Sequence, residues 1–332
     1  MRVGLIGVGR IGTLHAETLR DIPEVEALVL ADASTSRARE AAEKLGVGHA
    51  SVEELFAMAL DGVVVAAATS AHAELVLRAA EAGVPVFCEK PLAADVPGTR
   101  EVLARVKAAG IPLQMGFQRR FDPGYQAARA ALVAGELGTL HSVWACTLDP
   151  APPAPEYLPT SGGIFRDCSI HDIDAIRWLT GREVVEVRAT GANKGADFFA
   201  AADDVDTGHA LLTLDDGTLV SLAASRYNGA GYDVRLELHG SRRTVVVGLD
   251  ERVPLASAEP GARWPTQRAY ANFAERFHSA YVAELRAFVD VIAGRSESPC
   301  SGEDALAALY VAEACERARR ENRTVRIDEV SG

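Results

Sequence analysis

The sequence of 332 residues contains only five cysteines, and no two of them form a C-x-x-C pair. They are Cys88, Cys146, Cys168, Cys300 and Cys315. An odd and widely spaced set is typical neither of a disulfide framework nor of a zinc site. We therefore interpret the cysteines as reduced, mostly buried small side chains, and we expect no metal.

Long apolar runs are also absent. The longest stretch, residues 62–68, is far shorter than the roughly 20 residues that a transmembrane helix needs. The N-terminus begins with a short apolar strand where a secretory signal would have a charged and apolar leader. We therefore expect a cytoplasmic protein without membrane contact.

Basic charge is scarce, because 34 basic residues face 46 acidic ones and the net charge is −12. A protein with this balance and no basic patch does not attract nucleic acid or an anionic membrane. The sequence shows no internal repeat or low-complexity tract. Its length favours two domains.

The first residues form a glycine-rich turn between a strand and a helix. The turn occupies Gly7, Val8, Gly9, Arg10, Ile11 and Gly12. In a G-x-G-x-x-G turn, Gly7 allows the tight bend, Gly9 lets a pyrophosphate approach the backbone, and Gly12 lets the helix pack close to the strand. We predict that a dinucleotide binds at Gly7, Gly9, Arg10, Ile11 and Gly12.

A second expected strand, residues 25–31, supports this prediction. It ends at Asp32, which lies 20 residues beyond Gly12. At this spacing a carboxylate accepts hydrogen bonds from the ribose hydroxyls of a dinucleotide.

The residues at and after Asp32 favour NAD over NADP. The carboxylate would repel a 2′-phosphate, and neither Ala33 nor Ser34 offers an arginine to receive one. Arg37 and Arg39 leave two interpretations open. They are either solvated charges on the next helix or contacts that allow some use of NADP.

The first third of the chain alternates β-branched runs with helical segments. Strands are expected at 2–6, 25–31, 62–67, 84–88 and 112–115. Helices are expected at 10–20, 36–45, 52–59, 71–82 and 96–109. This alternation predicts an α/β fold with a doubly wound parallel sheet, a Rossmann domain that binds NAD over residues 1–118.

The pattern then changes to consecutive strands. Strands are expected at 140–147, 184–192, 207–214, 219–226, 234–239 and 244–247. Helices are expected at 124–134, 163–179, 270–293 and 302–321, with a proline-rich loop at 150–159. Residues 119–332 therefore predict an α+β domain with a largely antiparallel open sheet, for substrate binding and oligomerisation.

Lys90 follows the expected strand 84–88 within the run Glu89-Lys90-Pro91. In open α/β sheets the ligand crevice lies beyond the carboxyl ends of the strands. Lys90 is therefore a candidate cation for a substrate hydroxyl. The alternative is a solvated loop residue.

The expected helix 163–179 carries three ionisable side chains on one face, because Asp167, His171 and Asp174 stand at i, i+4 and i+7. Burial of such a group is costly unless its members are paired or functional. The alternative is an ordinary intrahelical pair of Asp167 with His171, with Asp174 at the surface.

Three other segments have two interpretations each. Thr69, Ser70 and His72 follow the third strand, where side chains reach the nicotinamide half of a cofactor, but Thr69 or Ser70 could instead cap the next helix. The run 118–122 is either part of a site or a charged interdomain hinge. For Tyr232 the default interpretation is packing.

The whole chain closely resembles the Gfo/Idh/MocA family of sugar and cyclitol oxidoreductases, and within it the bacterial inositol 2-dehydrogenases. The resemblance rests on the glycine turn, Asp32, Thr69, His72, Glu89-Lys90-Pro91, residues 116–122 and the Asp167-x-x-x-His171-x-x-Asp174 pattern. Further similar runs are residues 149–153, 161–167, 231–233 and 275–277.

The resemblance implies a role for most of these residues. It makes Lys90, Asp167 and His171 the catalytic group. It adds Arg119, Asp149 and Tyr232 as residues near a polyol, and Thr69, Ser70, His72, Glu89, Lys90 and Gln118 as cofactor contacts. It also implies a cis bond before Pro91 and a homotetramer joined through the second-domain sheet. Two departures near the expected pocket leave the substrate open, namely Gln118 where several relatives have methionine, and residues 228–231.

The expected reaction is NAD-dependent oxidation of myo-inositol to 2-keto-myo-inositol. His171 would take the hydroxyl proton, Asp167 would support the imidazolium, and the Lys90 ammonium would stabilise charge on oxygen. The alternatives are D-chiro-inositol, scyllo-inositol, an aldose or an aminocyclitol as substrate. A non-catalytic NAD-binding regulator is a further alternative, although it would have little need for all three residues.

Overall fold

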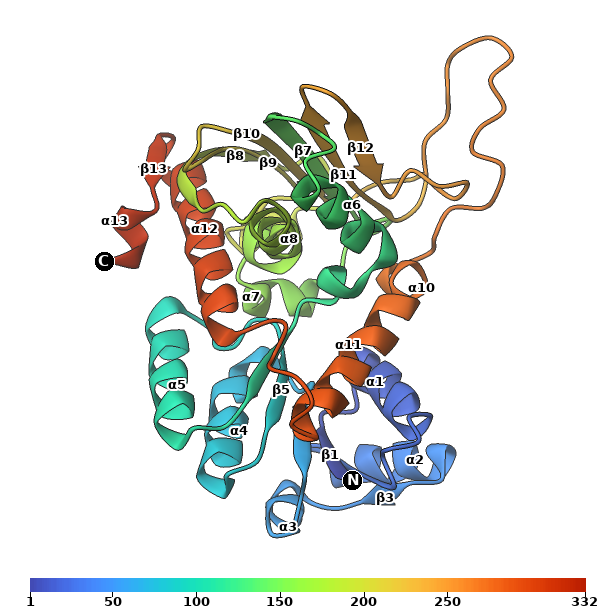
Figure 1. Ribbon diagram of the computed structural model, residues 1–332, viewed down its shortest axis with the longest axis vertical. Helices are drawn as coiled ribbons and strands as arrows, with labels where there is room; N and C mark the ends of the chain where they lie inside the picture. Colours follow the sequence, from blue (N-terminus) through green and yellow to red (C-terminus); the bar gives the residue numbers. More distant parts are fainter. The chain divides into compact units, whose positions relative to one another are not determined.

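The computed structural model describes residues 1–332, which form two compact units. The first unit contains Met1–Phe121 and Ser279–Ala307, and the second contains Asp122–His278 and Ala308–Gly332. Figure 1 colours the chain in sequence order, so that the late return to the first unit can be followed. We expected one boundary, between residues 118 and 119. In the structure the first unit ends at Phe121, and it also includes residues 279–307.

The sheet of the first unit has six strands in the order β3-β2-β1-β4-β5-β6, and all of its neighbours pair in parallel. The strands are β1 Arg2–Ile6, β2 Ala27–Ala31, β3 Gly48–His49, β4 Gly62–Val65, β5 Val86–Glu89 and β6 Leu113–Gly116. The predicted doubly wound parallel sheet is confirmed. Only the edge strand β3 was not predicted, because it is two residues long.

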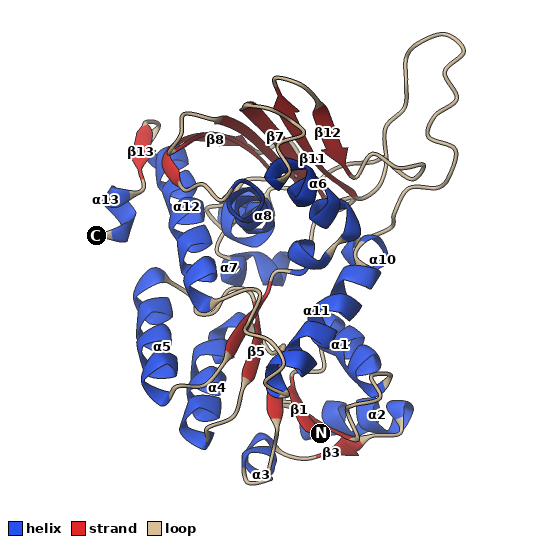
Figure 2. Cartoon of the chain, in the orientation of Figure 1, coloured by secondary structure: helices blue, strands red, loops and turns tan.

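Helices connect these strands. They are α1 Arg10–Arg20, α2 Thr35–Leu45, α3 Val52–Phe56, α4 Thr69–Ala82, α5 Val96–Ala109 and the short η1 Gln118–Phe121, with α11 His278–Ile292 returning later. Figure 2 shows α4 and α5 on one side of the strands and α1, α2 and α11 on the other. On the α1 side, Leu285 and Phe288 of α11 share one buried apolar cluster with Leu5 and Leu30. The returning segment therefore completes the core of the first unit.

The sheet of the second unit has seven strands in the order β12-β11-β7-β10-β9-β8-β13. They are β7 Leu140–Leu148, β8 Val184–Ala192, β9 Thr207–Leu214, β10 Leu219–Ser225, β11 Asp233–Gly240, β12 Thr244–Val247 and β13 Thr324–Arg326. Only β7 and β10 pair in parallel. The predicted, largely antiparallel sheet is confirmed.

The helices of the second unit include several short turns. They are α6 Pro123–Val133, η2 Pro155–Tyr157, α7 Leu158–Ser161, η3 Phe165–Ser169, α8 Ile170–Thr180, α9 Phe198–Ala201, α10 Phe273–Arg276, α12 Gly302–Glu321 and α13 Asp328–Ser331. Helix α12 begins in the first unit and continues in the second. No helix of the protein combines the length and the apolar character needed to cross a bilayer.

Two long helices predicted from the sequence are interrupted. The segment expected as one helix over 163–179 begins with a π-helical stretch, η3, and only then continues as α8. The segment expected at 270–293 is divided at Phe277, whose φ of −112° ends α10. The prolines at 150–159 permit η2 and α7, because proline is compatible with the first turn of a helix.

All five cysteines are buried thiols without a disulfide, as the sequence predicted. Burial raises the pKa of the Cys146 thiol to about 12, with a further contribution from the neighbouring Asp233 carboxylate. Thiols with raised pKa values are weak nucleophiles at neutral pH. The cysteines therefore act as small core side chains.

Candidate active site

The glycine turn after β1 combines close packing with open space. Gly7 has a φ of +99°, and a Cβ there would lie 2.5 Å from the backbone of Ala67. A Cβ on Gly12 would lie 1.8 Å from the carbonyl oxygen of Gly7. A Cβ on Gly9 would meet no atom within 4 Å. Gly7 and Gly12 are thus required by packing, whereas Gly9 keeps a space clear beside the backbone.

That space adjoins the start of α1. The helix begins at Arg10, its N-cap is Gly9, and no side chain caps it. The first backbone N–H groups of Arg10 and Ile11 lack helical acceptors and carry the positive end of the helix dipole. The residues present therefore fit the pyrophosphate of a dinucleotide.

Asp32 directly follows β2 and is only 5% exposed. One carboxylate oxygen accepts a hydrogen bond from the Val8 N–H at 2.9 Å, and the other accepts one from the Ser34 N–H at 2.8 Å. Burial alone would raise the pKa of Asp32, but these bonds and the Arg37 guanidinium lower it below its usual value. An ionised acceptor is thus fixed beside the glycine turn, where a ribose would need it.

The structure distinguishes Arg37 from Arg39. The Nη2 atom of Arg37 lies 2.6 Å from Asp32 Oδ1, although the arginine side chain is 61% exposed. Arg39 lies 4.0 Å from Glu43 on the surface of α2. Arg39 is therefore a solvated helix charge, whereas Arg37 is bound to the predicted ribose acceptor.

The candidate residues after β4 do not cap a helix. Helix α4 begins at Thr69 after an Ala68 N-cap without a side-chain bond, so the capping alternative for Thr69 and Ser70 is wrong. The His72 ring is buried, with Nδ1 2.7 Å from the Pro91 carbonyl and Nε2 3.0 Å from the Ala67 carbonyl. His72 thus ties the ends of β4 and β5 together. Contact of these residues with a cofactor stays a prediction.

Glu89 and Lys90 stand at the carboxyl end of β5. Glu89 Oε1 lies 2.7 Å from the Nε2 atom of His15, a fully buried residue of α1. The Lys90–Pro91 peptide bond is cis, as the family resemblance implied. His15 was not predicted, because a histidine on the buried face of a helix gives no signal until its partner is known.

The charged run 118–122 is largely buried, and the boundary between the two units falls within it, after Phe121. Gln118 is 3% exposed and Arg119 is 1% exposed. Arg120 lies 3.2 Å from Asp304 and also donates to the Pro299 carbonyl. The structure leaves the cofactor role of Gln118 and the substrate role of Arg119 as predictions.

The second unit holds a group that we call the carboxylate cluster, made of Asp149, Tyr157, Asp167 and Arg226. Arg226 Nη1 donates to Asp149 Oδ2 at 3.0 Å, and Nη2 donates to Asp167 Oδ2 at 2.6 Å. The Tyr157 hydroxyl donates to the other Asp167 oxygen, Oδ1, at 2.8 Å. Two predicted site residues are thus held together by two residues that the sequence did not indicate.

The parallel pairing of β7 and β10 explains this meeting. Leu148 pairs with Ser225 at the carboxyl ends of the two strands. Asp149 and Arg226 are the next residues on each strand, and the Asp149 N–H donates to the Ser225 carbonyl at 2.8 Å. Side chains one position beyond paired ends lie next to each other.

Burial governs the charges of the carboxylate cluster. It raises the pKa of Asp149 above its usual value, although the Arg226 guanidinium opposes the shift. Burial also raises the pKa of Tyr157, and the Asp167 carboxylate adds to that increase. Tyr157 is therefore a neutral donor, and one guanidinium serves two carboxylates.

Asp167 and His171 belong to consecutive helical segments, since Asp167 lies in η3 and His171 in α8. Both are partly buried, and Asp174 is fully buried. The alternative that placed Asp174 at the surface is therefore wrong. π-helical turns inside helices occur frequently at functional sites.

Tyr232 is 6% exposed, and its N–H donates to the Tyr270 carbonyl at 2.9 Å. This burial fits the packing interpretation. Lys90 belongs to the first unit, whereas His171 belongs to the second. Their convergence on one substrate stays a prediction, as does the role of Tyr232 near a polyol.

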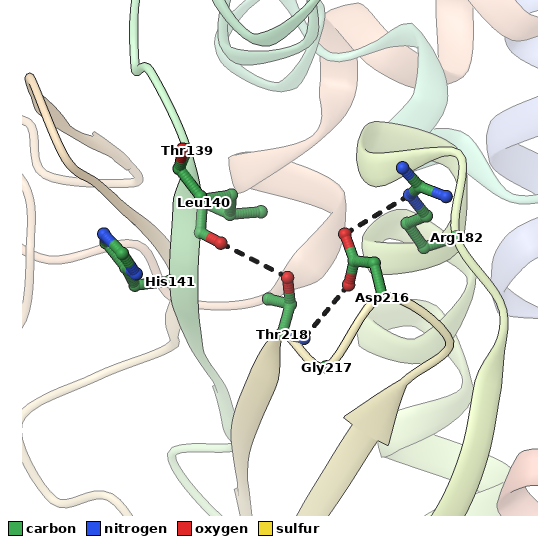
Figure 3. A pocket seen from close by; sticks show the side chains of 7 residues that line it. All are labelled: Thr139, Leu140, His141, Arg182, Asp216, Gly217 and Thr218. Carbon is green, nitrogen blue, oxygen red and sulfur yellow. Dashed lines mark hydrogen bonds and ion pairs between the residues drawn. The ribbon is translucent and has the colours of Figure 1, made fainter.

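A polar cavity of about 420 Å³ lies at the other end of β7 from Asp149 (Figure 3). It is lined by Thr139, Leu140, His141, Arg182, Asp216, Gly217 and Thr218. Arg182 lies 3.3 Å from Asp216, and Asp216 accepts a bond from the Thr218 N–H at 3.0 Å. Figure 3 also shows the Leu140 carbonyl accepting from the Thr218 hydroxyl, and none of the lining residues is a candidate site residue.

Taken together, the glycine turn, the helix start and Asp32 define a dinucleotide-binding protein of the Rossmann dehydrogenase class. The chain belongs to the Gfo/Idh/MocA oxidoreductase family. The family model for the NAD-binding Rossmann fold matches residues 1–117, and the model for the C-terminal domain matches residues 125–246.

Similar proteins extend over the whole chain. A myo-inositol dehydrogenase of Streptomyces leeuwenhoekii is 42% identical over 96% of this chain and 97% of its own length. A myo-inositol 2-dehydrogenase of Thermotoga maritima is 37% identical over the full length of both chains. The structure of a scyllo-inositol dehydrogenase from Lactobacillus casei, with bound NAD(H) and scyllo-inositol, matches with a TM-score of 0.90 and 28% identity, covering 99% of each chain.

Proposed function

We propose that this protein uses NAD to oxidise a secondary hydroxyl of a cyclitol, with myo-inositol as the substrate and 2-keto-myo-inositol as the product. The observation that carries the proposal is the carboxylate cluster, in which Arg226 and Tyr157 hold the Asp167 carboxylate. Asp167 stands four residues before His171, and the other unit contains the glycine turn that fits a dinucleotide. The full-length likeness to two myo-inositol dehydrogenases supports the choice of substrate.

The residues of this chain divide the work as follows. Gly7, Gly9 and Gly12 with the start of α1 would hold the pyrophosphate, and Asp32 would hold the ribose. When bound, NAD supplies the two-electron acceptor that alcohol oxidation requires.

His171 would accept the proton of the hydroxyl as the general base, because imidazole accepts a proton near neutral pH and an unassisted alkoxide is far too basic. The Asp167 carboxylate would stabilise the imidazolium that forms. Lys90 would stabilise negative charge on the substrate oxygen.

Asp149 is suited to bind a second hydroxyl. Its contacts within the protein, to Arg226 and to the Cys168 thiol, both use Oδ2. Its side chain is 24% exposed, so Oδ1 remains available to a ligand. A polyol offers several neighbouring hydroxyls, which matches a site with more than one carboxylate.

We further propose that residues 1–118 bind NAD, that residues 119–332 bind the polyol, and that the protein works as a cytoplasmic homotetramer joined through the open face of the second sheet. That face carries Leu211 and Leu219, which are 61% and 60% exposed. Light scattering of the purified protein and of Leu211→Glu would test the assembly. A monomeric wild-type protein would contradict it.

The main test mixes the protein with NAD and myo-inositol, scyllo-inositol, D-chiro-inositol or an aldose, and follows the near-ultraviolet absorbance of reduced cofactor. We expect the largest kcat/KM with myo-inositol. A larger kcat/KM with scyllo-inositol would identify scyllo-inositol as the substrate instead. No reduced cofactor from any polyol would support a non-catalytic NAD-binding role.

Within this test, His171→Ala should slow the chemical step by about 100- to 10,000-fold, the usual contribution of a general base. His141→Ala is the matched control, because His141 is an exposed histidine of the same unit. Stopped-flow reduction at a near-normal rate in His171→Ala would contradict the assignment of the base.

A further inference from the structure

Arg226 is a buried arginine at the centre of the carboxylate cluster, and its side chain is only 4% exposed. Its position is fixed by the backbone, since its N–H donates to the Asp206 carbonyl at 2.7 Å. The Nε atom is buried without a hydrogen-bond partner. Burying a guanidinium with one N–H unsatisfied is costly. The two carboxylates therefore account for its presence.

Both terminal nitrogens of Arg226 are used, and each serves a different segment. Nη1 contacts Asp149 at the end of β7, and Nη2 contacts Asp167 in η3. Tyr157 then fixes the remaining oxygen of Asp167. The orientation of the Asp167 carboxylate is thus set by two donors, one of them charged.

Removal of the guanidinium would leave two partly buried carboxylates facing each other. Two such groups share a proton, because like charges at short range do not both ionise. The titratable groups that face the cluster are Tyr157 and Cys168 near Asp167, and Asp204 with the Glu316–Arg319 pair beyond Arg226. His171 follows Asp167 by four residues. Arg226 is the cation that contacts both Asp149 and Asp167.

We propose that Arg226 is a positioning residue for the dehydrogenase reaction, because it keeps Asp167 ionised and correctly oriented behind the base His171. The inference rests on the proposed function of Asp167 and His171. It assigns Arg226 no contact with substrate or cofactor. Its expected effect is on kcat and on the pH profile, with the KM for NAD unchanged.

The experiment compares Arg226→Gln and Arg226→Lys with the wild type, using whichever cyclitol the panel identifies. In Arg226→Gln we expect kcat to fall at least about tenfold, less than for loss of the base itself. We expect the acidic limb of the kcat profile to move upward by about one pH unit or more, since a neighbouring arginine lowers a carboxyl pKa by 1–3 units. Arg226→Lys should lie between Arg226→Gln and the wild type in both readouts.

Arg177→Gln is the matched control. Arg177 is also buried, and it donates two bonds of 2.7 Å to Glu183 at the other end of α8. We expect this variant to retain the kcat and the acidic limb of the wild type. Circular dichroism and thermal unfolding verify that each variant is folded.

Three results would overturn the inference. An unchanged kcat and limb in Arg226→Gln would show that Arg226 is dispensable. A lower kcat without movement of the limb would reduce Arg226 to a structural role. If Arg226→Gln does not fold, Arg226→Lys is the deciding variant. A kcat and an acidic limb equal to those of the wild type in Arg226→Lys would contradict the proposal that the guanidinium positions Asp167.

A separate measurement distinguishes failure of this inference from failure of the proposed function. If none of the polyols gives reduced cofactor with the wild type, the proposed function is wrong. The pKa of Asp167 is still measurable by NMR of aspartate labelled with ¹³C at Cγ. Asp167→Asn identifies the signal. An upward shift of that pKa in Arg226→Gln supports the charge-setting role, and an unchanged pKa refutes it.

Discussion

The glycine turn of the first unit and the carboxylate cluster of the second are assembled by different physical means. The turn uses backbone and missing side chains, and its critical distances involve Gly7, Gly12 and the backbone of Ala67. The cluster uses three charged side chains and one tyrosine hydroxyl, which come from the residues after β7 and β10 and from η2 and η3. At Gly7 and Gly12 the first site has no room for an added atom, whereas the second site depends on the balance of its charges.

The largest effect should come from adding one methyl group to the turn. In Gly12→Ala the new Cβ would lie 1.8 Å from the Gly7 oxygen, so the backbone must move. We expect a loss of about 3 kcal/mol or more in the free energy of unfolding, at the upper end of overpacking costs. Denaturant titration measures this loss.

Gly9→Ala provides the comparison. Its Cβ would meet no atom within 4 Å, and Gly9 has an ordinary φ of −71°. We expect near wild-type stability but NAD binding weakened about tenfold, which corresponds to 1.4 kcal/mol. If Gly9→Ala binds NAD normally, the open space beside Gly9 is not the pyrophosphate site.

An effect of similar size is expected when the charge beside the turn is removed. Asp32→Asn should weaken NAD binding about tenfold, because a hydrogen bond to a charged acceptor contributes about 1.5 kcal/mol or more. It should also improve the use of NADP, since Arg37 would lose its carboxylate partner and become available to a 2′-phosphate. The ratio of kcat/KM for the two cofactors measures both effects.

The double variant Asp32→Asn with Arg37→Ala is the control for this prediction. It should lose the gain with NADP and keep the loss with NAD. An equal gain with NADP in the single and the double variant would show that Arg37 has no part in cofactor choice.

The smallest effect concerns stability against pH, and it has opposite signs in the two regions. The pKa of Asp32 is lowered from 3.8, so its contribution to stability is present above that pH and is lost as pH falls through the lowered value. The pKa of Asp149 is raised from 3.8, so its carboxyl favours the folded state below that pH and loses this effect as pH rises through the raised value.

Thermal unfolding of Asp32→Asn and Asp149→Asn over acidic to neutral pH tests this contrast. We expect differences of only a few degrees in Tm. At neutral pH Asp32→Asn should be less stable than the wild type, whereas Asp149→Asn should be as stable or more stable. A loss of stability at neutral pH in both Asp32→Asn and Asp149→Asn would contradict the opposite pKa shifts of the two carboxyl groups.

The sequence predicted the parallel sheet of the first unit well, because its signals are local. Glycine spacing, the apolar strands and the acidic residue after β2 all act within about 30 residues. The strands β3 and β13 were not predicted, since strands of two and three residues carry no pattern of their own. They exist because a neighbouring strand offers hydrogen bonds.

The second site was predicted only in part, because it depends on strand pairing. Asp167 and His171 were named from their spacing on one face of an expected helix, and Asp149 from the family resemblance. Arg226 and Tyr157 were not named, since nothing in a sequence indicates that β7 and β10 would pair in parallel within an otherwise antiparallel sheet. The π-helical stretch was also not predicted, because apolar periodicity does not distinguish it from an ordinary helix turn.

The late return of α11 has a consequence for synthesis on the ribosome. Residues 1–121 emerge first, but the core around β1 and β2 also contains Leu285, Phe288, Val289 and Val291. Until these residues leave the exit tunnel, the nascent Rossmann half has apolar surface that only the far end of the chain can cover. This core is therefore completed only when nearly the whole chain has been synthesised. Until then, chaperones that bind exposed apolar segments can bind the uncovered surface of the Rossmann half.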